Sequence, residues 1–346
     1  MSASRDAVRV RGWRRLVAAQ EAGIFVALAV LCLIIVLATS GQFLRPDNLQ
    51  NITKRSALLA IFAMGETFVI ITGGIDLSVG SLVALTGVLA TKLMVDAGQP
   101  LWVAVLVVLG VSAGVGLFHG AAVTKLRFQP FVVTLATMLI LRGAALNICN
   151  QEPIPVPGHN DFDALANGLA GRLPIVAYTD RGLGPGWLQV PIPAYILLGE
   201  ALIFGLALSA TAFGRHLIAV GNNEEAARLS GVPVTRVKVA AYVICALMVG
   251  FSGVLEASLS GQGDYRAGQL YELMAIAASV IGGCSLMGGQ GSVVGTILGA
   301  GVLIVIDNGI NLAGKNPSFW RDIVVGATVF LAVLVDIGRQ WWRRRR

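Results

Sequence analysis

The chain has 346 residues, of which 55% are strongly hydrophobic and 13% are charged. A soluble domain typically has about 25% charged residues, so an ordinary soluble protein is excluded. The net charge of +7 includes five arginines before Leu16 and five after Ile337, clusters that are typical of the cytoplasmic ends of a membrane protein rather than of nucleic-acid binding. The composition predicts an all-α polytopic membrane protein whose surroundings are the lipid bilayer.

Apolar runs predict about ten transmembrane helices, because a bilayer core needs about 20 apolar residues per helix. The expected spans are 23–40, 57–72, 79–95, 101–124 and 130–148, then 191–211, 237–257, 273–287, 292–311 and 322–337. An even number of spans places both termini on one side of the membrane. With that side as cytoplasm, 16 of the 26 Lys and Arg residues lie inside, which favours an N-in, C-in topology.

We therefore treat residues 1–346 as a single transmembrane domain with four extramembrane parts. These are a basic cytoplasmic N-terminus (1–22), a periplasmic loop (149–190), a cytoplasmic loop (212–237) and a basic C-terminus (338–346). The periplasmic loop contains five prolines and is expected to be irregular and exposed.

The cytoplasmic loop has the pattern of a short capped helix. Asn222 is expected as its N-cap with Glu225 at the third helical position, and Gly231 is expected to stop it. The simplest alternative is a solvated charged loop.

Motifs of soluble enzymes are missing. The sequence has no P-loop for ATP phosphates, its cluster Gly288-Gly289-Gln290-Gly291 lacks the strand of a dinucleotide fingerprint, and its three histidines are scattered. We therefore expect no catalytic residues, no metal site and no cofactor in this chain.

Two glycine-rich segments interrupt the apolar runs, and on the predicted topology both lie on the inner side. The first contains Gly73, Gly74, Asp76 and Ser78, and the second covers 282–292. Each is either a well-made turn or a broken helix lining a water-filled path, and for the first the spacing favours neither. Glycines four residues apart, at 110/114, 116/120 and 291/295/299, predict close helix packing.

Charged residues within spans are costly and so are functional candidates. Glu66, Arg142 and Glu200 fall near mid-depth, where Arg142 either pairs with a glutamate or faces a hydrophilic conduit with them. Lys92, Glu256 and Asp307 lie nearer the outer interface, and snorkelling to water is the simple explanation for them.

Several motifs in order resemble the permease subunits of bacterial sugar ABC importers, the ribose, xylose, arabinose and galactose group. The resemblance covers nearly the whole chain, and it is carried by the segments 73–81, 130–138 with 142–143, 221–231, 276–283, 288–292 and 308–312. It implies a fold like that of type II importers, in a homodimer in the bacterial inner membrane. It also implies a periplasmic sugar-binding protein and two cytoplasmic ATPase subunits, or one tandem ATPase, that bind ATP and Mg²⁺.

The resemblance assigns roles to two sets of residues. The cytoplasmic helix matches the coupling loop of importers, which docks on the ATPase, with Asn222, Glu224, Glu225, Ala226, Ala227, Arg228 and Gly231. The candidates for the translocation path are Gly73, Gly74, Asp76, Ser78, Glu66, Arg142, Glu200, Asn308 and Asn311. The function implied is ATP-driven import of a pentose or hexose, with hydrolysis in the partner subunit and selectivity mainly in the binding protein.

Some features depart from the family pattern and leave the sugar open. His119 stands where such permeases usually have asparagine, Glu200 lies in a span that is usually uncharged, and the periplasmic loop is long.

Two alternative functions stay open. One is a proton-coupled secondary transporter that uses Glu66 or Glu200, and the other is an ABC permease for branched-chain amino acids or nucleosides. Arg172, Arg181 and Lys315 are either docking contacts for the binding protein or simply solvated.

Overall fold

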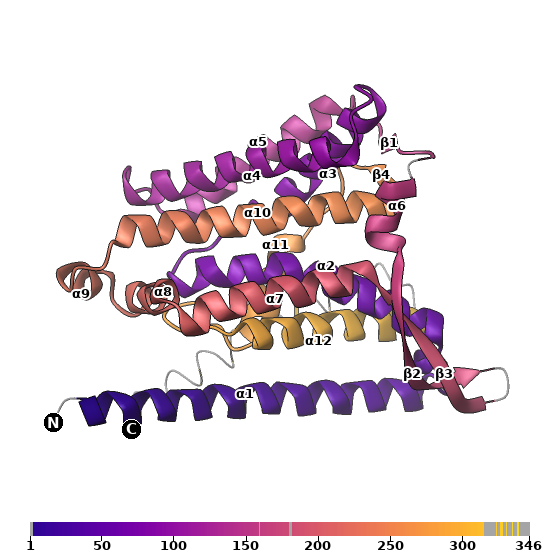
Figure 1. The fold of residues 1–346 in the computed structure, drawn as a ribbon, viewed down its shortest axis with the longest axis horizontal. Coiled ribbons are helices and arrows are strands. Elements are labelled where there is room, and N and C mark those ends of the chain that lie inside the picture. The colour runs from indigo at the N-terminus through magenta and orange to yellow at the C-terminus, as the bar shows by residue number, and fades with distance from the viewer. Residues whose placement is uncertain are drawn as a thin grey trace.

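The computed structural model describes residues 3–158, 160–179 and 182–314, together with 323, 326, 327, 330, 334 and 338. Apart from those single positions, the expected span 322–337 and the basic segment 338–346 lie outside the described residues, as do Arg181 and Lys315. Within the described ranges, long helices run back and forth along one axis as a bundle (Figure 1).

Most helices follow the expected spans, but α1 and α2 begin at Ala3 and Pro46, well before the expected starts at residues 23 and 57. The first half contains α1 (Ala3–Ala38), the 3-10 helix η1 (Gln42–Leu44), α2 (Pro46–Ile71), α3 (Val79–Val95), α4 (Leu101–Thr124) and α5 (Pro130–Ile148). The second half contains α7 (Ile192–Ala210), α8 (Ala212–Asn222), α9 (Glu224–Leu229), α10 (Val234–Ser260), α11 (Tyr271–Ile281) and α12 (Val293–Leu312). In the described ranges, six helices are long and apolar enough to cross a membrane, namely α1 from Glu21, α4, α5, α7, α10 and α12, while α3 and α11 are shorter apolar helices.

Helix ends show why some boundaries differ from the predicted ones. Pro46 and Pro130 stand at or next to the first position of α2 and α5, where the missing N–H of proline costs no hydrogen bond. The expected span 273–287 is too long, because α11 ends at Ile281 and Gly283 has a φ of +97°. A left-handed residue at this position ends the helix.

The centre of the bundle is α2, which packs against α7, α10, α11 and α12. Every residue from Ala57 to Ile71 is buried, including Glu66. The charges of Lys54, Arg55 and Glu66 reduce the apolar character of α2, yet its second half is the most enclosed helix segment described. A helix buried on all sides is expected to be apolar all round, so the buried Glu66 needs a local explanation.

Small residues bring α4 and α10 into close contact, as the four-residue spacing predicts. A Cβ atom added at Gly116 or Gly120 would lie 2.6 Å from the Cα of Val243 or Val239 on α10. Gly110 and Gly114, by contrast, have open space where a Cβ would be placed. Among the described residues, therefore, the second pair of glycines on α4 serves helix packing and the first pair does not.

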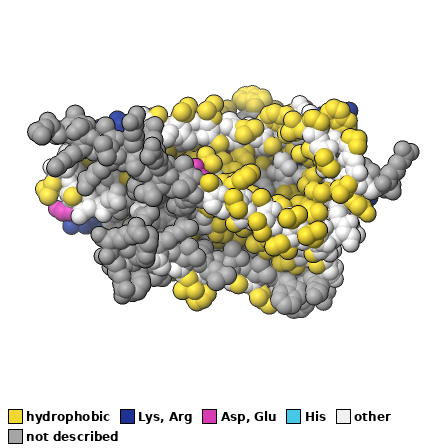
Figure 2. Space-filling model, turned by 90° about the horizontal axis from the view of Figure 1, so that it is seen from below, with side chains coloured by type: hydrophobic (Ala, Val, Ile, Leu, Met, Phe, Trp, Pro, Cys, Tyr) yellow, Lys and Arg dark blue, Asp and Glu magenta, His cyan; other side chains and the backbone are white. Residues whose placement is uncertain are grey.

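The outer surface of the bundle is apolar. Along α1, which packs on α12, side chains such as Phe25, Leu33 and Leu37 are exposed. Figure 2 shows the described part of one face, seen from below, as mostly hydrophobic. A surface of this kind is stable against lipid tails rather than water.

Two short sheets correct the all-α expectation and the expectation of an irregular 149–190 loop. β1 (Ile154–Pro155) pairs antiparallel with β4 (Gln262–Gly263), and β2 (Leu169–Thr179) forms a hairpin with β3 (Gly182–Pro191). The segment also contains α6 (Asn160–Asn167). In a two-stranded hairpin each strand has a free edge, so Pro174 and Pro185 are tolerated without the loss of ladder hydrogen bonds. The hairpin lies at the end of the bundle opposite α9 (Figure 1).

Candidate functional site

The short helix α9 lies at the same end of the bundle as the start of α1 (Figure 1). Its N-cap is Asn223, whose side-chain oxygen accepts a hydrogen bond from the Ala226 N–H at 2.9 Å. The prediction that Asn222 is the cap is therefore wrong by one residue. α8 continues through Asn222, and the Asn222 Nδ2 donates to the Ile218 carbonyl one turn earlier.

The predicted stop at Gly231 is confirmed. Gly231 has a φ of +82°, and its N–H donates to the Arg228 carbonyl at 3.0 Å. The N–H of Val232 donates to the Ala227 carbonyl, also at 3.0 Å. These two bonds form a Schellman motif, in which a left-handed glycine satisfies the last carbonyls of a helix. Ala227 is buried and Val232 packs in the same apolar cluster, which anchors α9 to the bundle.

The rest of α9 faces outward and carries charge. Glu224 accepts from Lys238 at 2.6 Å and from Arg228 at 2.7 Å. The hydrogen bond from Lys238 is the main cause that lowers the pKa of Glu224, with the charges of both cations adding to it. Glu225 is exposed, and the side chain of Leu229 is 81% exposed. The helix therefore presents an acid and a large apolar side chain to solvent on a rigid, capped frame.

The α8–α9 junction contacts both glycine-rich breaks. The Gly289 N–H donates to the Ile71 carbonyl at 2.8 Å, which joins the second break to the end of α2. Gly221, at the end of α8, packs on this bond, since a Cβ there would overlap the Ile71 oxygen and lie 3.0 Å from the Gly289 Cα. A Cβ on Gly288 would likewise lie 3.0 Å from the backbone nitrogen of Gly73. The breaks thus lie side by side, in contact with the last turn before α9.

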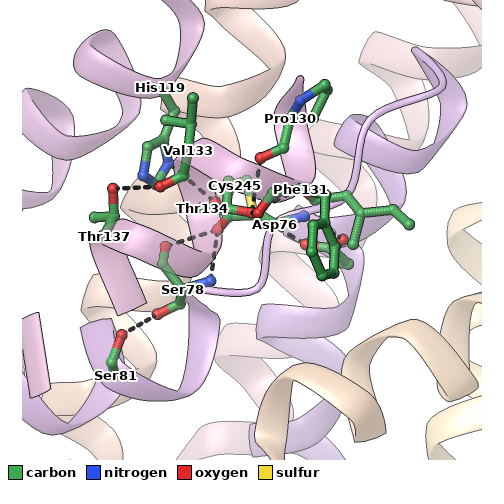
Figure 3. Close-up of polar contacts among 12 residues, drawn as sticks. Asp76, Ser78, Ser81, His119, Pro130, Phe131, Val133, Thr134, Thr137 and Cys245 are labelled. Carbon is green, nitrogen blue, oxygen red and sulfur yellow. Dashed lines mark hydrogen bonds and ion pairs between the residues drawn. The ribbon is translucent and has the colours of Figure 1, made fainter. Parts of the chain in front are cut away.

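The first break is held by buried carboxylates (Figure 3). Asp76 Oδ1 accepts from the N–H of Ser78 at 2.8 Å and from its hydroxyl at 2.7 Å. The Asp76 N–H in turn donates to Glu66 Oε1 at 3.0 Å. Glu66, Asp76 and Ser78 are all buried, so Asp76 rather than the Ser78 side chain satisfies the backbone at the start of α3.

Three neighbouring helices complete this cluster. His119 on α4 is fully buried and places its Nδ1 3.3 Å from Asp76 Oδ2. The Cys245 thiol of α10 donates to Glu66 Oε2 at 3.8 Å, and Thr134 on α5 donates its hydroxyl to the Ile75 carbonyl at 3.2 Å. The arrangement fixes the backbone of a broken helix within an apolar bundle. In the described ranges, no group of three metal-ligating side chains is placed to hold an ion.

The sequence is similar to one known protein family and to several individual proteins. Residues 48–333 match the family described as "branched-chain amino acid transport system / permease component". The chain belongs to this permease family. It is 40% identical to the ribose import permease protein of Escherichia coli (strain K12), over 90% of this chain and 93% of that protein. It is 37% identical to the ribose import permease protein of Bacillus subtilis (strain 168), over 92% of each.

A third relative is the xylose transport system permease protein of Escherichia coli (strain K12), which is 36% identical over 90% of this chain and 91% of that protein. No solved structure matches. Together with the six apolar helices that are long enough to span a bilayer, these matches identify a multi-pass permease of the inner membrane.

The structure of the permease does not bring all the path candidates together. Arg142 does not pair with either mid-span glutamate among the described residues, so of the two alternatives for Arg142 the ion pair is wrong. Its Nη1 instead donates to the carbonyls of Tyr265 at 2.6 Å and Ala267 at 2.5 Å, in the loop before α11. Backbone carbonyls at a chain turn accept hydrogen bonds from a guanidinium, and sequence spacing does not reveal such partners.

The remaining candidates lie away from the breaks. Asn308 forms a reciprocal amide pair with Asn48 near the other end of α12, at 2.6 and 3.1 Å. Asn311 is exposed and donates to the Asp307 carbonyl. Glu200 lies on α7, and none of the described residues donates a hydrogen bond to its buried Oε2. Only Glu66, Gly73, Gly74, Asp76 and Ser78 form one site.

Sequence analysis missed several residues of this site. Tyr242 on α10 is fully buried, and the centroids of its ring and the His119 ring are 5.9 Å apart. A Cβ added at Gly74 would lie 2.6 Å from the Tyr242 hydroxyl oxygen. A second buried group joins three helices, because Thr67 of α2 shares hydrogen bonds with Ser279 of α11 and Thr296 of α12 at 3.1 and 2.7 Å. For Tyr242 and its neighbours, the signal in the sequence was His119, a histidine within an expected span.

Proposed function

We propose that this permease is the transmembrane subunit of an ATP-driven, binding-protein-dependent importer of a monosaccharide. The observation that carries the proposal is the capped, outward-facing α9, joined through Gly221 to two broken helices, in a chain similar to ribose and xylose permeases. The permease would form the translocation path, while a separate ATPase binds ATP and Mg²⁺.

We further propose ten spans with both termini in the cytoplasm, in a homodimer. The start of α1 and α9 lie at one end of the bundle, and the hairpin β2–β3 lies at the other (Figure 1). The basic N-terminal residues and the cations around α9 would then lie inside, as the positive-inside rule requires. The hairpin end would face the periplasm and the sugar-binding protein.

In this assembly α9 would dock in a groove of an ATPase subunit, either one of two copies or half of a tandem protein. Leu229 would supply apolar contact area and Glu225 a charge for orientation, since both are exposed. Closure of the ATPases on ATP would move α9 as a rigid body. Because Gly221 packs on Ile71 and Gly289, that movement would shift the two breaks and change access to the path.

Proton exchange at Glu66 gains no support from the geometry. Its carboxylate is fully buried, and both oxygens are engaged, one by the Asp76 N–H and one by the Cys245 thiol. The helices alone do not distinguish a sugar permease from a permease for branched-chain amino acids, so transport itself must decide between the two.

The test is co-expression of the permease with a candidate ATPase and binding protein from the same source, followed by purification and reconstitution into liposomes. We expect co-purification of the ATPase and uptake of radiolabelled D-ribose or D-xylose that needs both ATP and the binding protein. Uptake of L-leucine but of neither sugar would refute the proposal that the solute is a monosaccharide. Uptake driven by a proton gradient without ATP would refute the proposal of an ATP-driven importer.

A pair of charge reversals tests the docking surface. Glu225→Lys on α9 should weaken ATPase co-purification, while Glu152→Lys reverses an equally exposed charge at the hairpin end and should leave it intact. Equal recovery of the ATPase with both variants would refute docking through α9.

A further inference from the structure

A cavity of about 180 Å³ lies among α2, α10, α11 and α12, toward the hairpin end of the bundle. It is lined by the first half of α2, the last turns of α10, the first turns of α11 and the later part of α12. The lining side chains that matter for recognition are Arg55, Phe62, Glu256, Ser260, Tyr271 and Asp307. The cavity lies well away from α9 and both breaks, at the end where an imported solute would arrive.

Its lining combines three kinds of group. Arg55, Glu256 and Asp307 bring a guanidinium and two carboxylates to one small space, each from a different helix. Phe62 and Tyr271 stack with ring centroids 5.2 Å apart and planes 11° apart. The remaining lining is mostly aliphatic, with Leu58, Leu59, Leu259, Met274 and Ile304.

This mixture matches the chemistry of a sugar. Each hydroxyl of a monosaccharide is both donor and acceptor, so carboxylates accept from it while a guanidinium donates to it. The C–H faces of the ring are apolar and pack against aromatic or aliphatic side chains. Small-molecule sites commonly combine apolar walls with a few convergent polar groups, as this cavity does.

The size also limits the ligand. Cavities for drug-sized ligands measure about 300–1,000 Å³, so 180 Å³ suits a solute of about ten non-hydrogen atoms, such as a pentose. A disaccharide is too large. Snorkelling to water, the simple sequence-based explanation for Glu256 and Asp307, does not account for their convergence with Arg55 and two stacked rings.

We propose that this cavity is a low-affinity monosaccharide site on the periplasmic side of the permease, which receives the sugar released by the binding protein. The proposal rests on the proposed function and adds a place for the sugar. Glu256 and Asp307 accept from sugar hydroxyls, Arg55 donates to them, and the Tyr271–Phe62 pair supports one face of the ring.

The experiment is protection of an introduced cysteine in the reconstituted importer complex. Ser260→Cys places a thiol in the cavity wall, and Ala97→Cys places a control thiol in the exposed turn before α4. The rate of maleimide labelling is measured with D-ribose, D-xylose, sucrose or L-leucine. At about ten times the dissociation constant of the pentose, labelling of the Ser260→Cys thiol should slow roughly tenfold by mass action. The control thiol should not be protected.

A second substitution tests the aromatic pair. In the Ser260→Cys background, Tyr271→Ala should raise the half-protecting concentration of pentose roughly two- to tenfold, while Tyr271→Phe, which keeps the stack, should change it little. Equal half-protecting concentrations in both variants would show that the aromatic pair does not contact the sugar.

The outcomes separate the two proposals. If the complex imports ribose or xylose but neither sugar slows labelling in the cavity, the cavity proposal is overturned and the importer stands. Protection by sucrose or by L-leucine overturns the ligand class. If the complex imports neither sugar, the proposed function itself fails.

Discussion

Replacing Gly221 by alanine tests whether the α8–α9 junction controls the two breaks. Gly221 is the next-to-last residue of α8 and has no positive φ, so alanine fits its backbone. The added Cβ, however, would overlap the Ile71 carbonyl oxygen and press on Gly289, whose N–H donates to that oxygen at 2.8 Å. The substitution therefore acts as a wedge of one methyl group between α8, α2 and the second break.

The magnitude follows from three contributions. Overpacking by one methyl group costs about 1–3 kcal/mol. Loss of the hydrogen bond from Gly289 to Ile71 costs about 0.5–1.5 kcal/mol. Alanine gains about 0.5–1 kcal/mol over glycine within a helix. The net loss of folding free energy is about 0.5–4 kcal/mol, enough to shift the junction without unfolding the chain.

The assays are thermal unfolding in detergent and the ratio of sugar imported to ATP hydrolysed in proteoliposomes. Gly221→Ala should lower the melting temperature by several degrees and reduce that ratio while ATP hydrolysis continues. Gly205→Ala on α7 is the matched control, because nothing lies within 4 Å of a Cβ placed there. Equal melting temperatures and equal ratios for the two variants would refute the contact as a coupling element.

Three further predictions concern single groups. Gly231→Val forces a β-branched residue to a φ of +82° and should cost about 1–2 kcal/mol, seen as a lower melting temperature and weaker ATPase co-purification. The pKa of Glu224 is lowered, mainly by Lys238. The ionised carboxylate therefore stabilises the fold fully above its ordinary pKa of 4.5, and this contribution is lost as the pH falls through the lowered pKa. Since Glu224 is partly exposed, Glu224→Gln should lower stability by less than about 1 kcal/mol near pH 7, and the difference should vanish in melting curves near pH 3. His119→Leu removes the partner of buried Asp76 and should cost about 1–3 kcal/mol in thermal unfolding, whereas His119→Asn keeps a donor and should cost less.

The sequence predicts the helices of this permease well, because the signal is local. Apolar runs, and the proline that opens α5, set most boundaries to within a few residues, whereas α1 and α2 begin well before the expected spans 23–40 and 57–72. The centre of the bundle could not be predicted in this way. α2 contains Lys54, Arg55 and Glu66 and resembles a poor span, yet its residues 57–71 are all buried, since neighbouring helices cover this part of it.

The candidate site is predictable only where its contacts are local. Ser78 and Asp76 are two residues apart, and the stop at Gly231 is a property of one turn, so the sequence reveals both. The contact of Asp76 with His119, and the carbonyls that receive Arg142, join residues far apart in the chain. Long-range pairs of this kind depend on how helices pack, and the spacing of residues along the sequence does not reveal that packing.

The two ends of the permease are connected by α2 itself. Arg55 and Phe62 line the cavity, Glu66 holds the first break, and Ile71 contacts Gly221, all on one helix of 26 residues and about 39 Å. Because residues 57–71 are enclosed on every side, this part of α2 cannot bend on its own, and a displacement of its inner end moves Phe62 as well. A wedge at Gly221 should therefore alter the cavity.

The combination of Gly221→Ala with Ser260→Cys measures this transmission directly. The maleimide labelling rate of the Ser260→Cys thiol in nucleotide-free complex should differ between the Gly221→Ala and Gly205→Ala backgrounds. An identical rate, with the melting temperature of Gly221→Ala still lowered, would mean that the breaks absorb the displacement locally. In that case α10, which also runs from α9 to the cavity, would be the element to test next.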